Sequence, residues 1–75
     1  MARSELLEAI LRAQFELEYA EPEELPASLE RFNALVDRAI AGTHLTRREL
    51  LSVLRDRYHS YKRAQLMAEA RRRSV

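Results

Sequence analysis

Between residues 4 and 20, apolar residues recur at helical spacing and fall into two neighbouring rows on one side of a helical wheel. The rows are Leu6, Ile10, Ala13 and Leu17, and beside them Leu7, Leu11 and Phe15. Ser4 is placed to cap the first turn. Because two rows are wider than one neighbouring helix covers, we expect this helix to contact two partners.

The segment EPEELP interrupts this pattern, and a second helical pattern follows it. Pro26 disfavours helical geometry at the residue before it, so we expect a turn there and a helix over residues 27–41. Its apolar stripe is narrower than that of the first helix. Gly42, the single glycine, follows at the position where a left-handed residue commonly ends a helix.

The segment LTRRELLSVL, residues 45–54, marks the start of a third helix. Thr46 and Glu49 have the spacing of a capping box, and Leu45 and Leu50 have the spacing of a hydrophobic staple. No glycine or proline follows, so the helix is predicted to cover residues 47–72, a length of roughly 40 Å. It is longer than the other two, and its end should extend beyond them.

These patterns predict an all-α fold, a three-helix bundle with a long C-terminal third helix, formed by a single domain over residues 1–75. A chain of 75 residues buries only about 60% of its unfolded surface, so association with a second chain is expected to complete the core. We expect a homodimer. The residues predicted to form its interface are Leu7, Leu11, Phe15, Tyr58 and Tyr61.

The charge of the chain is divided between its two parts. Residues 1–30 carry eight glutamates and two arginines, a net charge of −6, whereas residues 31–75 carry eleven basic and four acidic residues, a net charge of +7. Such asymmetry is typical of proteins that contact nucleic acids or membranes. It equally fits an acidic first helix lying beside a basic third helix, within one chain or across a dimer.

A DNA-binding function is the alternative to protein interaction. The order helix, glycine-containing turn, helix resembles a helix-turn-helix arrangement, and Arg47 and Arg48 lie in the first turn of its second helix. The predicted contacts to DNA are Arg47, Arg48, Arg55 and Lys62. Against this, the turn is about one residue longer than usual, and the arginines could simply be solvated or paired with the acidic helix. Tyr58 and Tyr61 could stack on bases, although their helical spacing favours burial.

The sequence offers little for other kinds of chemistry. It has no cysteine, no glycine-rich phosphate loop and no evident serine–histidine–carboxylate set. Asp56 and His59 share a helix face but do not complete a metal sphere. We therefore expect no enzyme activity, no metal, no cofactor and no membrane contact. The leading hypothesis is a small cytoplasmic, bacterial protein-interaction module that binds another protein or itself.

Overall fold

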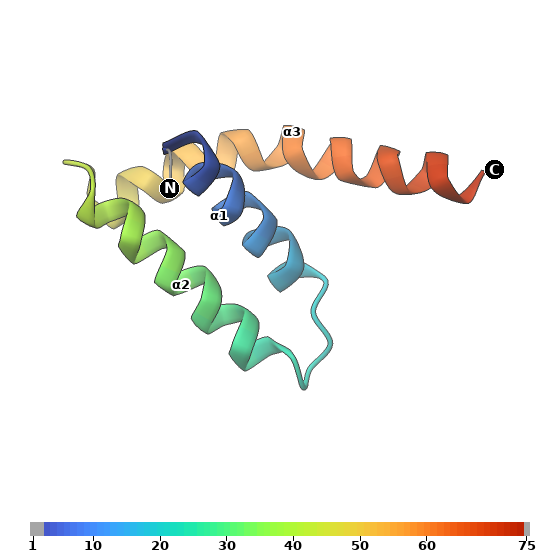
Figure 1. Cartoon of the computed structure of the whole chain (residues 1–75), viewed down its shortest axis with the longest axis horizontal. Coiled ribbons are helices and arrows are strands. Elements are labelled where there is room, and N and C mark those ends of the chain that lie inside the picture. Colours follow the sequence, from blue (N-terminus) through green and yellow to red (C-terminus); the bar gives the residue numbers. More distant parts are fainter. Residues whose placement is uncertain (1–2, 75) are drawn as a thin grey trace.

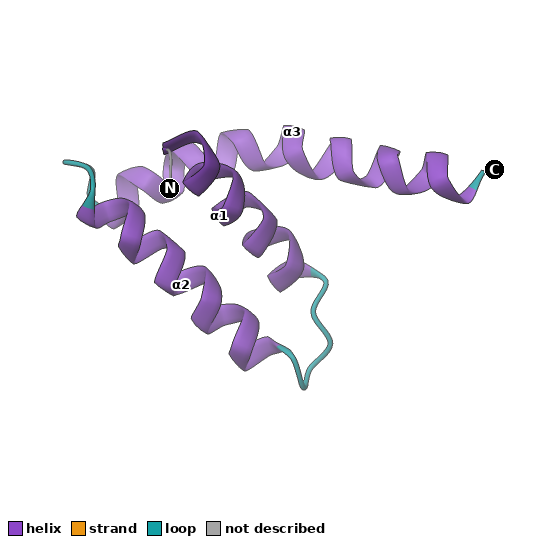
Figure 2. Cartoon of the chain, in the orientation of Figure 1, coloured by secondary structure: helices purple, strands orange, loops and turns teal. Residues whose placement is uncertain are grey.

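The computed structural model describes residues 3–74, and this part of the chain forms three helices joined by two short connections (Figures 1 and 2). They are α1 (Arg3–Glu18), α2 (Leu25–Ala41) and α3 (Arg47–Arg73). No strand occurs among the described residues. The predicted all-α fold with a long third helix is confirmed. No helix in residues 3–74 is long and apolar enough to cross a membrane.

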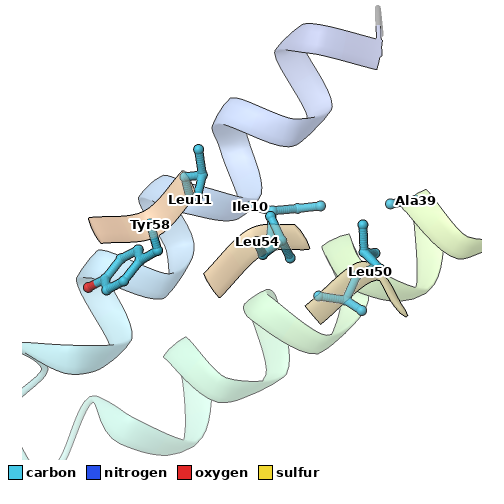
Figure 3. Packing of buried hydrophobic residues seen from close by; sticks show 7 residues of the cluster. Ile10, Leu11, Ala39, Leu50, Leu54 and Tyr58 are labelled. Carbon is cyan, nitrogen blue, oxygen red and sulfur yellow. The ribbon is translucent and has the colours of Figure 1, made fainter. Parts of the chain in front are cut away.

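Helices α1 and α2 form an antiparallel hairpin, and the N-terminal half of α3 crosses it (Figure 1). All three helices contribute to one hydrophobic cluster (Figure 3). Ile10, Val36 and Leu54, one from each helix, are its most completely buried large side chains. The two apolar rows of α1 are thus covered by two neighbours, as predicted, and both neighbours belong to the same chain.

Both ends of α1 and the start of α2 differ slightly from the sequence predictions. Helix α1 already includes Arg3, so Ser4 lies inside the first turn and not at the cap, and the helix ends at Glu18 instead of residue 20. Helix α2 begins at Leu25 and contains Pro26 in its first turn. Proline is tolerated there because the amides of the first turn have no partner within the helix. Differences of one or two residues are normal at helix ends.

Gly42 ends α2 at the predicted position but not with the predicted conformation. Its φ and ψ are −96° and 5°, so it is not left-handed. The amides of Gly42 and Thr43 donate to the carbonyls of Ala39 and Ile40, which tightens the last turn. These bonds bring the chain towards α3 without a left-handed residue. Glycine is therefore not required at this position by its backbone geometry.

The start of α3 is the predicted capping box. The backbone amide of Glu49 donates to the Thr46 hydroxyl at 3.2 Å, and the amide of Thr46 donates to the Glu49 carboxylate at 3.0 Å. The bond from the Thr46 amide to the carboxylate lowers the pKa of Glu49, and the Thr46 side chain lowers it further. The reciprocal pair fixes where α3 begins and hence where it crosses the hairpin.

The C-terminal part of α3 extends beyond the hairpin (Figure 1). Tyr58 is the last buried residue of the helix. We call residues 63–73 the overhang, and none of these residues is buried. Alanine, arginine, leucine, methionine and glutamate are good helix formers, which explains why the segment is helical without tertiary support.

Candidate interaction surfaces

The five residues predicted to form a dimer interface lie largely within the core of one chain. Leu11 and Tyr58 are each only 8% exposed. Leu7, Phe15 and Tyr61 are half-buried and pack against the same cluster. The rings of Phe15 and Tyr61 meet edge to face, with centroids 6.3 Å apart. The apolar row of α1 and the tyrosine face of α3 thus meet inside the chain. Leu11 and Tyr58 are buried there and leave little surface for a second chain, whereas Leu7, Phe15 and Tyr61 keep part of their surface exposed.

A polar contact joins the far end of α1 to the middle of α3. The carboxylate of Glu18 accepts a hydrogen bond from the Tyr58 hydroxyl and an ion-paired bond from the Lys62 ammonium, at 2.6 Å for the latter. The hydrogen bonds from Lys62 and Tyr58 lower the pKa of Glu18. Burial raises the pKa of Tyr58, and its bond to the carboxylate raises it further. Glu18 is therefore ionised and Tyr58 is neutral at neutral pH.

Lys62 consequently has a structural role that its sequence context did not reveal. Its bond to Glu18 raises the pKa of Lys62, and its ammonium also lies 5.6 Å from the centre of the Tyr19 ring. The prediction that Lys62 contacts DNA is weakened because the ammonium is already engaged by α1. In the sequence, Glu18 shares a helix face with Leu11, which indicated that its carboxylate lies near the buried side of α1. Only the crossing of the helices determines that Lys62 is its partner.

Arg47, the first residue of α3, is also engaged within the chain. Its guanidinium donates to the Asp37 carboxylate at 2.9 Å and to the side-chain oxygen of Asn33, both on α2. The sequence had suggested pairing with the acidic first helix, whereas the structure shows pairing with α2. This contact anchors the start of α3. It also pairs, within the chain, one of the two arginines that the sequence placed in the first turn of a DNA-binding helix.

Arg48 and Arg55 remain exposed on the outer face of α3. Together with Arg47, Leu51 and Ser52 they line a shallow depression that contains no carboxylate. Among the described residues, neither Arg48 nor Arg55 makes an ion pair. Two of the four predicted nucleic-acid contacts are therefore accessible to an outside ligand.

An open apolar groove lies where the start of α1, the end of α2 and the start of α3 meet. Its volume is about 690 Å³, and its apolar walls include Leu6, Leu7, Leu45 and Val53. Arg38, His44 and Arg57 also line it, and no acidic residue does. The groove could accept an apolar group. The positive charges of Arg38 and Arg57 favour a ligand that is also negatively charged.

Two further exposed surfaces differ in charge but share an apolar component. The overhang contains Arg63 and the run of arginines 71–73 against Glu69, a net charge of +3, and it exposes Leu66 and Met67. We call residues 19–30 the acidic tip. It contains four glutamates and no basic residue, a net charge of −4, and it exposes Leu25 and Leu29. The length of the third helix predicted the overhang, whereas no sequence pattern singled out the tip.

The described residues contain no cluster of three or more histidine, aspartate or glutamate side chains that could hold a metal ion. Asp56 and His59 are both exposed on α3. The surfaces available for function in residues 3–74 are thus the groove, the arginine depression, the overhang and the tip. No family model, curated protein or solved structure matches this chain.

Proposed function

We propose that this chain is a small non-enzymatic helical interaction module that associates with a second copy of itself. The observation that carries the proposal is the overhang. The overhang, residues 63–73, continues past the hairpin as regular helix and holds two large apolar side chains in solvent, Leu66 at 42% and Met67 at 53% exposure.

Helix propensity alone does not explain these two side chains. Alanine and arginine would keep the overhang helical without exposing apolar surface, and single exposed leucines are common on protein surfaces. Here, however, Leu66 and Met67 lie together with Arg63 and Ala70 around a shallow depression on α3. An exposed apolar surface with polar residues around it marks a site of contact with another molecule, and a second polypeptide is one such partner.

Sedimentation equilibrium of the wild-type chain over a wide concentration range tests the proposal. We expect reversible association, and we expect the double substitution Leu66→Glu, Met67→Glu to abolish it. The matched control is Ser52→Glu, Ser60→Glu, which adds the same charge to exposed positions of α3 outside the overhang. A wild-type chain that remains monomeric at high concentration contradicts the proposal, as does a double variant that associates like the wild type.

Nucleic-acid binding is the second candidate, and the depression that contains Arg48 and Arg55 supports it. Fluorescence anisotropy with a random-sequence DNA duplex tests this function. Binding through phosphates should weaken by orders of magnitude between about 50 and 200 mM salt. The double substitution Arg48→Ala, Arg55→Ala should reduce it further, with Arg38→Ala as a control on another surface. Absence of binding at the lower salt concentration would eliminate this candidate.

A further inference from the structure

We infer that two copies of this chain form a reciprocal dimer in which the overhang of each copy docks on the acidic tip of the other. This inference rests on the proposed self-association and specifies its geometry. It identifies a basic surface, its acidic complement and the partner that carries both. The contacts would be the same on both sides of a two-fold axis.

The two surfaces match in charge. Residues 63–73 carry a net charge of +3 and residues 19–30 a net charge of −4. The nearest carboxylates on α1 outside the tip are already used, because Glu16 pairs with Arg31 and Glu18 pairs with Lys62. The glutamates of the tip are all exposed and make no ion pair among the described residues. They remain accessible to the arginines of another chain.

The two surfaces also match in their apolar content. Leu25 and Leu29 are 43% and 49% exposed, and they lie one turn apart on the same face of α2. Leu66 and Met67 border the depression on the overhang. Docking would bury apolar side chains at the centre and leave charged residues around them, which is the usual arrangement of a specific interface.

The C-terminal end of the overhang lies away from the tip of its own chain. In Figure 1 the turn between α1 and α2 and the end of α3 extend in different directions from the point where the helices cross. Helix α3 is continuous from Arg47 to Arg73, and in the described residues no hydrogen bond or ion pair joins the overhang to the tip. A second copy can supply each missing contact.

Charge also selects the pairing between copies. Two overhangs facing each other would bring like charges together, and so would two tips, and such juxtaposition is unfavourable. Pairing overhang with tip places opposite charges together twice in one dimer. Because each chain has one surface of each kind, a closed dimer uses all of them and leaves none to extend a filament.

Charge reversal of each surface tests this geometry. The overhang-reversed variant carries Arg71→Glu, Arg72→Glu and Arg73→Glu. The tip-reversed variant carries Glu21→Lys, Glu23→Lys and Glu24→Lys. In sedimentation equilibrium at low salt, each variant alone should associate at least about tenfold more weakly than the wild type, because like charges would then face each other. An equimolar mixture of the two should associate again, since both of its overhang–tip contacts join opposite charges.

The absence of cysteine from the chain allows a second measurement of the same geometry. A chain carrying Leu29→Cys, mixed with a chain carrying Met67→Cys, should form a covalent dimer with a short bis-maleimide cross-linker. Either variant alone should cross-link much less. Circular dichroism of every variant, alone and mixed, checks that the helices are retained.

The outcomes separate the inference from the proposal on which it rests. A monomeric wild type overturns both. A wild type that associates, together with a tip-reversed variant that associates equally well, leaves self-association standing and overturns the reciprocal docking. Failure of the mixture of folded variants to associate overturns the docking in the same way.

Discussion

Leu54 and Leu66 offer a matched pair of substitutions, because both are leucines on α3 and both can be truncated to alanine. Leu54 is 1% exposed at the centre of the three-helix core, whereas Leu66 is 42% exposed on the overhang. The atoms removed and the change in helix propensity are the same at both sites. Any difference in effect therefore reports what surrounds each side chain.

The burial of each leucine sets the expected change in the free energy of unfolding. Truncating a fully buried leucine costs the lost transfer free energy plus a cavity term, so Leu54→Ala should reduce the free energy of unfolding by about 3–4 kcal/mol. A domain of 75 residues has a total stability of roughly 4–11 kcal/mol. In the monomer, Leu66→Ala should change stability by no more than about 0.5 kcal/mol, because no surrounding core is left with a cavity.

Urea unfolding followed by far-ultraviolet circular dichroism provides the assay, at two protein concentrations about a hundredfold apart. The loss at Leu54 should be present at both concentrations, because the core lies within one chain. The loss at Leu66 should appear only at the higher concentration, where association stabilises the folded state. A loss below about 1 kcal/mol at Leu54 would refute the assignment of the core. An equal loss for both variants in dilute solution would refute the distinction between core and overhang.

Three further predictions concern particular contacts. Gly42→Ala should stabilise the chain by about 0.4–1 kcal/mol in thermal unfolding, because its φ is negative and an added Cβ would meet only carbonyl oxygens at 3.9 and 4.0 Å; a loss of stability would show that this backbone conformation is wrong. Thr46→Ala should cost about 1 kcal/mol in urea unfolding, with the smaller cost of Thr46→Gly as its control; no loss would mean that the capping box contributes nothing. Glu18→Gln should destabilise the chain at neutral pH, and its difference from the wild type should shrink as the pH falls below 4.5, since the folded state lowers the pKa of this carboxyl and its stabilisation is lost as the pH falls through that lowered pKa. Urea unfolding across pH measures this, and a difference that is independent of pH would contradict it.

Local features of the fold could be predicted because the residues that make them are neighbours in the chain. Thr46 and Glu49 form the capping box three residues apart, and the third helix begins where their spacing places it. The two apolar rows of the first helix correctly indicated two packing partners. Gly42 was placed correctly at the end of the second helix, but its left-handed conformation was wrong, because backbone hydrogen bonds tighten the turn in another way.

The candidate surfaces could be predicted only in part. The length of the third helix indicated an overhang. The charge asymmetry left two interpretations open, a nucleic-acid or membrane contact and an acidic helix beside a basic one. The sequence placed Leu11 and Tyr58 between two chains, whereas they pack within one chain. It also left Arg47 and Lys62 available to DNA, whereas residues of α2 and α1 engage them.

The amino-acid sequence by itself determined the three helices, their apolar faces and the point where the last helix begins, because helical periodicity and capping act over a few residues. Only the tertiary structure determined which helix face packs against which other face. Helix α3 passes alongside α1 near Tyr58 and α2 near Arg47, contacts that link residues 40 and 10 positions apart. Periodicity shows that a helix face must be buried, but only the crossing of the helices shows what buries it.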